Sequence, residues 1–375
     1  MLVRKTPSDS CCKDEIKINA YVSARTTNAL LPLQAMNTHE QYMQRCLQLA
    51  LKGLGNVSPN PMVGCVIVHD DKIIGEGYHE KYGEAHAEVN AINSVQDKSL
   101  LKSSTLYVSL EPCNHIGKTP PCADLILKYE IPNVVIGIQD PFEKVNGSGI
   151  KKLMDAGVNV TSGVLEKECR EINKRFFTFH LEKRPYIILK WAQSKDGFIG
   201  KKNQSVRISN ELTRVINDTW RTQEDAVLIG GETARTDNPH LTVRSIEGRN
   251  PTRIILSNSG NLPSNLNLFD GNAPTLIYST NNFQYANSET VEMPDETNLD
   301  FLLSDLYRRN IQSVIVEGGS SVLNQFIKSD NWDEIRIFES EDLLEDGILA
   351  PTISSAISSF EQIDNNQLKI IYRRK

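Results

Sequence analysis

Short runs rich in β-branched and aromatic residues alternate along this chain with longer segments whose apolar residues recur at helical spacing. In the first half, this pattern predicts strands at 63–68, 72–77, 105–110, 133–138 and 159–164, and helices at 42–51, 86–95, 121–129, 150–156 and 165–182. Asp70 and Asp71 separate the first two strands, which indicates a hairpin. This order of elements predicts an α/β/α layered domain.

The pattern starts again after a Lys-Arg-Pro sequence at 183–185. Because the residue before a proline is biased away from the helical conformation, we divide the chain here into domains at 37–183 and 184–375. The second half predicts strands at 186–191, 226–229, 253–256, 275–278, 313–316 and 334–338, and helices at 210–221 and 320–327. Strands punctuated by helices again predict an α/β domain. A length of 375 residues is typical of two domains.

Residues 1–36 have a different character from the rest of the chain. They mix basic, hydroxyl and acidic side chains without a sustained amphipathic period, so we expect a disordered or extended tail. The segment lacks the apolar stretch of a signal peptide, and its acidic residues weigh against a transit peptide. Asn37 or Thr38 can then cap the first helix.

The composition limits the classes of function. A net charge of −6 argues against affinity for a nucleic-acid backbone, which requires concentrated lysine and arginine. No apolar run approaches the roughly 20 residues of a membrane-spanning helix. Seven cysteines, an odd and sparse set in a long chain, indicate reduced thiols rather than a disulfide framework. We therefore expect a cytoplasmic protein that acts on small molecules, without nucleic-acid or membrane partners.

The most informative residues are one histidine, two cysteines and one glutamate in the first half. His86, Cys113 and Cys122 can supply an imidazole and two thiolates to a tetrahedral zinc ion, which leaves a fourth position for water, as catalytic zinc requires. Zinc lowers the pKa of bound water to about 7. Glu88 follows His86 by two residues at a predicted helix start, where it can shuttle protons without being a ligand. This is the pattern of zinc-dependent nucleobase deaminases.

Each part of this pattern is weak alone, because a His-x-Glu or a Pro-Cys sequence occurs often by chance. The order is specific: the histidine and glutamate begin a helix, a strand follows, and both cysteines precede the next helix. We expect Cys113, like His86, to lie near a helix N-terminus, where a thiolate is favoured. Cys46 and Cys65 lie in apolar periodic segments and are interpreted as core residues.

The general deaminase pattern has two residues between its cysteines, whereas eight separate Cys113 from Cys122. With this insertion, the chain strongly resembles the bifunctional deaminase–reductases of riboflavin biosynthesis. The resemblance runs through residues 59–64 (PNPMVG), 86–88 (HAE) and 111–122 (EPCNHIGKTPPC). It implies a cytidine-deaminase-like domain that deaminates a diaminopyrimidinone carrying a ribosylamino 5′-phosphate. In that family, the counterparts of Asn60, His115 and Lys118 contact the substrate.

Without the resemblance, the second half offers weaker signals. Gly230-Gly231 and Gly318-Gly319 each follow a predicted strand, and such pairs are more often turns than phosphate-binding loops. They do not form the Gly-x-Gly-x-x-Gly pattern of a Rossmann domain. The resemblance continues through residues 190–197 (KWAQSKDG), 233–239 (TARTDNP), 241–244 (LTVR) and 317–319 (EGG).

These motifs resemble a reductase domain of dihydrofolate-reductase-like fold that uses NADPH to reduce the ribosyl group to a ribityl chain. The resemblance implies that the sugar phosphate is bound by Lys190, Ser205, Arg221, Leu241, Arg244 and Glu317. It implies that NADPH is bound by Gln193, Arg207, Thr233, Asp237 and Gly319. Arginine suits a phosphate, since its guanidinium offers paired donors. Two positions depart from the family pattern, Lys195 in place of leucine and Arg207 in place of tryptophan.

The sequence thus predicts a zinc- and NADPH-dependent bifunctional enzyme that converts 2,5-diamino-6-ribosylamino-4(3H)-pyrimidinone 5′-phosphate into the ribitylamino-uracil 5′-phosphate. The family resemblance also implies a homo-oligomer. One alternative is a monofunctional zinc deaminase whose reductase-like domain is not catalytic. A second is a deaminase-like nucleic-acid editor or binding module, which the acidic balance and the absence of an aromatic and basic stripe disfavour.

Overall fold

The computed structural model describes residues 37–114, 120–143, 145–202, 204, 206, 208–295 and 298–373. Two compact units make up the chain, Met1–His180 and Leu181–Lys375. The unit boundary lies a few residues before the predicted division at 183/184. The predicted tail at 1–36 lies outside the described residues.

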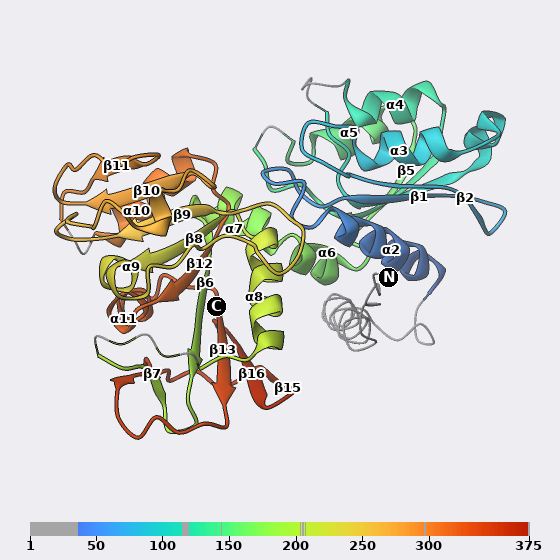
Figure 1. Ribbon diagram of the computed structural model, residues 1–375. Coiled ribbons are helices and arrows are strands. Elements are labelled where there is room, and N and C mark those ends of the chain that lie inside the picture. Colours follow the sequence, from blue (N-terminus) through green and yellow to red (C-terminus); the bar gives the residue numbers. More distant parts are fainter. Residues whose placement is uncertain are drawn as a thin grey trace, which may run out of the picture. The chain divides into compact units, whose positions relative to one another are not determined.

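The first unit is built on a five-stranded sheet in the order β2-β1-β3-β4-β5 (Figure 1). Its strands are β1 (Gly64–His69), β2 (Lys72–Tyr78), β3 (Thr105–Leu110), β4 (Asn133–Ile138) and β5 (Asn159–Ser162). Its helices are α2 (Thr38–Ala50), α3 (Ala87–Ser94), α4 (Cys122–Lys128), α5 (Ser148–Asp155), α6 (Glu166–Ile172) and α7 (Lys174–Glu182), with short 3₁₀ turns η2 (Leu51–Gly53) and η3 (Lys98–Ser103). β1 pairs antiparallel with β2 and β3, whereas β3, β4 and β5 are parallel.

Apolar side chains of this sheet point alternately into two helical layers. Val66 and Val68 of β1 pack in a cluster with residues of α2 and α6, while Cys65 and Ile67 pack with residues of α3, α4 and α5. The predicted α/β/α layering is therefore confirmed, and so is the assignment of Cys46 and Cys65 to the core, where both are fully buried. Asn37 caps α2 through a capping box with Glu40.

The predicted continuous helix over 165–182 is wrong, because the chain forms two helices that are interrupted at Asn173. The buried Asn173 side chain accepts a hydrogen bond from the backbone N–H of Met62 and donates one to the carbonyl of Met62. Helical periodicity in the sequence is local and does not report this pairing between distant segments.

The second unit contains a nine-stranded sheet in the order β11-β10-β9-β8-β12-β6-β13-β16-β15. Its strands are β6 (Tyr186–Gln193), β8 (Ala226–Gly230), β9 (Thr252–Leu256), β10 (Thr275–Ser279), β11 (Glu289–Glu292), β12 (Ser313–Gly318), β13 (Glu334–Ser340), β15 (Ser359–Ile363) and β16 (Asn366–Tyr372). β7 (Phe198–Gly200) and β14 (Ile348–Leu349) form a small separate sheet. The helices are α8 (Glu211–Gln223), α9 (Gly231–Asp237), α10 (Leu299–Arg308) and α11 (Ser320–Lys328), with a 3₁₀ turn η4 (Asn267–Phe269).

The strands from β11 to β13 are parallel, and β16 and β15 add an antiparallel edge. Two apolar clusters cover the sheet, with Ala226 and Leu228 in one and Val227 and Ile229 in the other. The sequence pattern did not predict α9, α10, β7, β11 or the strands after β13. The glycine pairs join strand to helix, β8 to α9 and β12 to α11, rather than forming isolated turns. None of the helices in the described ranges has the length and apolar character to span a membrane.

Candidate active sites

The structure brings the three predicted zinc ligands together. His86 is the N-cap residue of α3, Cys113 lies in the loop after β3, and Cys122 is the first residue of α4. The His86 Nδ1 atom lies 3.6 Å from the Cys113 Sγ atom and 3.3 Å from the Cys122 Sγ atom. One ligand atom from each residue lies within 4.8 Å of the others, and the described residues contain no other such group. One imidazole and two thiols fit a catalytic zinc ion.

The surroundings of Cys113 favour its ionised form. The Cys122 thiol and the His86 ring hydrogen-bond to it and, against the effect of burial, lower the pKa of Cys113 to about 4. The backbone N–H of Cys122 also donates to Cys113 Sγ, at 3.3 Å. Helix α4 begins at Cys122, nine residues after Cys113. Cys113 therefore contacts the N-terminus of this helix because the fold brings the two together, not because it is adjacent in sequence. A thiolate at neutral pH is the form that binds zinc.

Glu88 lies in the first turn of α3, beside this cluster. Its side chain is 3% exposed, and it hydrogen-bonds the Cys122 thiol. Burial is the main cause that raises the pKa of Glu88 to about 7. A carboxyl group with this pKa can accept and release a proton near neutral pH, as a general acid and base must.

Asn60, a predicted substrate contact, is oriented by a histidine that the sequence analysis missed. His79 is buried, and its Nδ1 atom lies 3.0 Å from the carbonyl oxygen of Ala85. Its Nε2 atom lies 3.0 Å from the Asn60 amide nitrogen, and its ring packs edge-on against His86. Burial lowers the pKa of His79, which favours the neutral ring that donates through Nδ1 and accepts from Asn60. Its position at the end of β2, seven residues before His86, was the available sequence signal.

Glu111, the first residue of the motif at 111–122, had no predicted role and makes four backbone contacts. Its buried Oε2 atom accepts from the N–H groups of Asp140 and Gly147, at 3.2 and 2.9 Å. Its Oε1 atom accepts from Gly149 and Ile150, at 2.9 and 3.2 Å. The carboxylate therefore ties the segment that leads to Cys113 to the N-terminus of α5. Two other predicted contacts, His115 and Lys118, lie outside the described residues.

In the second unit, an ion pair brings together two predicted substrate-binding residues. Arg221 of α8 donates from Nε and Nη2 to the two carboxylate oxygens of Glu317 on β12, each at 2.8 Å. Burial alone would raise the pKa of Glu317, but the charges of Arg221 and Lys190 lower it to about 2. Lys190 on β6 is half-buried, and its desolvation lowers its pKa. The result is a compact group of charged side chains at the carboxyl ends of adjacent parallel strands.

Arg244 is held by an acidic residue that the sequence analysis did not identify. Asp218 on α8 is 2% exposed, and its Oδ2 atom accepts from the backbone N–H groups of Arg244 and Ser245 and from the Ser245 hydroxyl. Leu241 has a left-handed backbone conformation, and its side chain is buried in the core beside Ile229. Asp218 thus fixes the backbone of the 241–245 segment. Ser205 and Arg207 lie outside the described residues.

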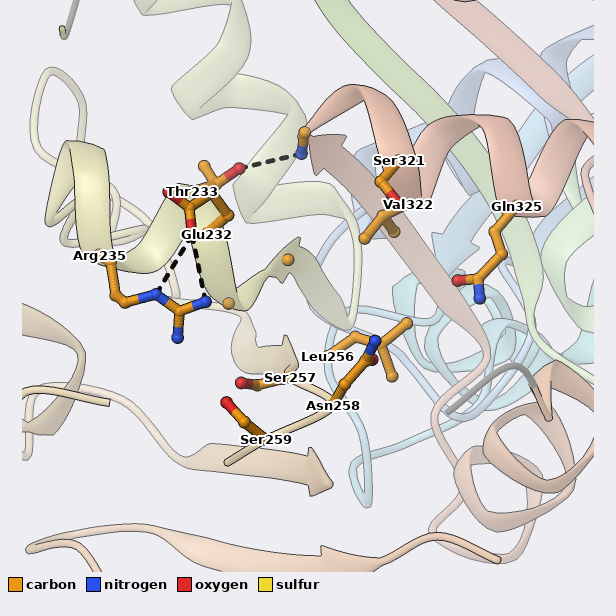
Figure 2. A pocket seen from close by; sticks show the side chains of 13 residues that line it. Glu232, Thr233, Arg235, Leu256, Ser257, Asn258, Ser259, Ser321, Val322 and Gln325 are labelled. Atoms are coloured by element: carbon orange, nitrogen blue, oxygen red, sulfur yellow. Dashed lines mark hydrogen bonds and ion pairs between the residues drawn. The ribbon is translucent and has the colours of Figure 1, made fainter. Parts of the chain in front are cut away.

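A pocket of about 270 Å³ in the second unit is lined by residues at and after the ends of β8, β9 and β12 (Figure 2). It contains Thr233 and Gly319, two of the predicted NADPH contacts, and the N–H of Gly319 donates to the Thr233 hydroxyl at 3.0 Å. Gln193 and Asp237 do not line this pocket. Gln193 instead donates to Glu339 and accepts from Trp191. The volume lies near the lower end of ligand pockets, so it suits part of a dinucleotide rather than a whole one.

Comparison with known proteins matches each half of the chain to a family. The cytidine and deoxycytidylate deaminase zinc-binding region matches residues 36–138, and the RibD C-terminal domain matches residues 185–340. The chain is 40% identical over 329 residues to the riboflavin biosynthesis protein RibD of Bacillus amyloliquefaciens, covering 84% of this chain and 88% of the relative. It is 34% identical over 325 residues to that of Escherichia coli K12, covering 81% and 88%.

Solved structures extend the similarity to both units. A Thermotoga maritima diaminohydroxyphosphoribosylaminopyrimidine deaminase/5-amino-6-(5-phosphoribosylamino)uracil reductase matches with a TM-score of 0.82 and 36% identity, covering 89% of this chain and 98% of that one. Acinetobacter baumannii RibD matches with a TM-score of 0.82 and 28% identity, covering 90% and 99%. The similarity therefore covers both units and their order along the chain.

Proposed function

Because the chain belongs to the family of the riboflavin biosynthesis protein RibD and is a bifunctional deaminase and reductase, we propose which of its residues perform the two steps. The observation that carries the proposal is the pair of separate polar groups, His86 with Cys113 and Cys122 in one unit, and Arg221 with Glu317 in the other. The cofactors are zinc for the first group and NADPH for the second.

In the first step, the pyrimidine of 2,5-diamino-6-ribosylamino-4(3H)-pyrimidinone 5′-phosphate loses an amino group as ammonia. His86, Cys113 and Cys122 would hold the zinc ion, which would supply a hydroxide nucleophile at neutral pH. Glu88 takes up a proton on its carboxylate and returns it to the departing nitrogen, a role that its burial and its pKa of about 7 support. Asn60, oriented by His79, hydrogen-bonds the ring edge, and His115 and Lys118 contact the rest of the substrate.

In the second step, the ribosyl group of the deaminated product is reduced to a ribityl chain. When bound, NADPH would supply the hydride for this reduction. Lys190 and Glu317 contact the sugar, and Arg221 and Arg244 neutralise its phosphate. Ser205 and Leu241 are further substrate contacts in this proposal. Thr233 and Gly319 bind the cofactor in the adjoining pocket, with Gln193, Arg207 and Asp237 as further contacts. The proposal also includes a cytoplasmic location and a homo-oligomeric state, both of which rest on the family resemblance. It further includes no nucleic-acid binding, which the net charge of −6 supports.

The two steps can be tested separately on the purified chain loaded with zinc. Ammonia release from the diamino substrate reports the first step, and NADPH oxidation with the deaminated intermediate reports the second. Glu88→Gln should reduce ammonia release by roughly 10² to 10⁴-fold while zinc content stays unchanged. The exposed Glu80→Gln variant is the matched control and should keep full activity.

Two results would contradict this assignment. Ammonia release that survives Glu88→Gln would remove the proton-shuttle role. A protein that releases ammonia but never oxidises NADPH would instead support a monofunctional deaminase with a non-catalytic second domain.

A further inference from the structure

Asp218 is a buried carboxylate that contacts two predicted phosphate-binding residues. It lies on α8 and is 2% exposed. Its Oδ2 atom accepts hydrogen bonds from the backbone N–H groups of Arg244 and Ser245, at 3.1 and 3.0 Å, and from the Ser245 hydroxyl at 2.7 Å. Its Oδ1 atom lies 3.4 Å from the Nη1 atom of Arg221. Burying a carboxylate is costly unless it is hydrogen-bonded, and these contacts provide that compensation.

The segment from Leu241 to Arg244 is held along its length by contacts within the second unit. Leu241 has a φ angle of 54°, in the left-handed region, which a non-glycine residue adopts only where its surroundings hold it. Its side chain is 3% exposed and packs in the core. The N–H of Val243 donates to the Asn250 side chain at 2.9 Å, and Asp218 holds the backbone at Arg244. The backbone of this segment is therefore fixed by protein contacts.

The two arginines present different guanidinium groups to a phosphate. Arg221 is 7% exposed and donates to both carboxylate oxygens of Glu317. Its Nη1 atom also donates to the Thr242 carbonyl and to Asp218. The Arg244 side chain is exposed, and no acceptor in the described ranges pairs with its guanidinium. Arg244 can therefore direct its paired donors to a phosphate, provided that its backbone is correctly placed.

Asp218 cannot favour a phosphate by its charge. Its carboxylate is negative, and its Coulomb interaction with a second anion is unfavourable. Its contribution must come from the donors and the backbone that it orders. A loop residue loses conformational entropy when it becomes fixed, and a segment that is already fixed does not lose it again on binding. The carboxylate therefore improves phosphate binding only if this ordering outweighs its repulsion.

We propose that Asp218 is a positioning residue of the reductase step, and that it holds the backbone of Arg244 where this arginine binds the 5′-phosphate of the substrate. Asp218 acts through this backbone and through Arg221, without touching the substrate. Glu317 has its own contacts with Arg221 and Asn217, so the reduction itself does not depend on Asp218. The inference rests on the proposed role of Arg244 as a phosphate contact.

The experiment follows NADPH oxidation with the deaminated intermediate and with the same compound lacking its 5′-phosphate. Asp218→Ala should raise the KM for the phosphorylated compound by about 10- to 100-fold, because the Arg244 backbone is no longer fixed before binding. The KM for the dephosphorylated compound, the KM for NADPH and kcat should each change by less than about threefold. Inhibition by inorganic phosphate measures the same subsite without turnover, and its Ki should rise with the KM.

Two milder variants keep the test decisive if Asp218→Ala does not fold. Asp218→Asn retains an oxygen that can accept from the Arg244 and Ser245 donors, so it should raise the KM for the phosphorylated compound by less than about 10-fold. Ser245→Ala removes only the hydroxyl contact with Asp218 and should raise the same KM by about 3- to 10-fold.

Asp333→Ala is the matched control. Asp333 is 6% exposed, accepts the N–H of Ile187 at 2.8 Å and pairs with Arg184, so it is also a buried carboxylate that fixes backbone. It precedes β13, whereas Glu317 lies near the carboxyl end of β12. Asp333→Ala should lower the stability of the second unit and leave the KM values unchanged.

Several outcomes would overturn the inference. An unchanged KM for the phosphorylated compound in Asp218→Ala, or equal losses with the phosphorylated and dephosphorylated compounds, would leave Asp218 a structural role alone. Tighter inhibition by inorganic phosphate in this variant would show that repulsion outweighs ordering. If Asp218→Ala does not fold, unchanged KM values in both Asp218→Asn and Ser245→Ala decide against the inference. An unaltered protein that oxidises no NADPH with the intermediate would instead contradict the proposed reductase function.

Discussion

Replacing Glu111 with glutamine tests how the zinc site is supported. The substitution keeps the shape of the side chain but exchanges one carboxylate oxygen for an NH₂ group, which donates instead of accepting. Each Glu111 oxygen accepts two backbone N–H groups. The variant therefore leaves two N–H groups facing a donor, and it removes a negative charge from the N-terminus of α5.

The structure sets the size of the expected effect. A buried donor without an acceptor costs about 1–3 kcal/mol, so two of them cost about 2–6 kcal/mol. Losing the charge at a helix N-terminus adds roughly 0.5 kcal/mol. We expect the first unit to lose about 3 kcal/mol of unfolding free energy, which lowers its Tm by roughly 6–12 °C for a domain of this size. Relaxation cannot easily reduce the cost, because a Cβ atom at Gly149 would lie 2.0 Å from the Pro112 carbonyl and the segments are already in close contact.

The assay uses the two activities as reporters of the two units. Residual ammonia release after heating follows the first unit, and residual NADPH oxidation follows the second. Glu111→Gln should shift the first curve and leave the second in place, and it should release zinc to a chelator faster because Cys113 lies two residues away. Glu130→Gln, which removes an exposed carboxylate paired with Lys102, should change stability by less than about 0.5 kcal/mol. A loss below about 1 kcal/mol in Glu111→Gln, or equal shifts of both curves, would refute the reasoning.

Three further predictions concern the second unit and the metal. The fully buried Arg253 side chain donates to Asp270, Thr275 and backbone carbonyls. Arg253→Met should therefore lower the unfolding free energy of the second unit by about 4 kcal/mol, as measured by urea titration. A loss under about 1 kcal/mol would contradict this. The pKa of Glu317 is lowered in the folded chain, so its contribution to stability is complete above about pH 4.5 and is lost as the pH falls toward 2. The stability of Glu317→Gln, measured by urea unfolding, should lack this loss at acid pH. Identical pH profiles of stability in the variant and the unaltered protein would refute this prediction. Removing zinc with a chelator should abolish ammonia release and leave NADPH oxidation with the deaminated intermediate intact, whereas loss of both activities would show that the metal supports more than the first step.

The sequence alone predicted those features whose physical cause lies within a short stretch of the chain. Short runs rich in β-branched and other apolar residues located the strands Thr105–Leu110 and Asn133–Ile138 at their observed bounds. The order of His86, Glu88, Cys113 and Cys122 predicted a cluster that the structure brings together. Turn and capping residues placed the helix that begins after Asn37. In each case a short stretch of chain carries the physical cause, which is a side-chain period, a cap or a ligand spacing.

Only the tertiary structure could decide features that depend on distant segments meeting. The break at Asn173 requires Met62, 111 residues away, and the four bonds to Glu111 come from residues 29 to 39 positions further on. His79 and Asp218 carry no motif, and they gain a role because the fold places Asn60 and Arg244 beside them. The orphan hydroxyl of Ser257 is likewise invisible in the sequence, since burial and the lack of a partner arise only when strands pack. Residue types and spacing thus determined the chemistry available to this protein, while packing decided which groups are held, buried and charged.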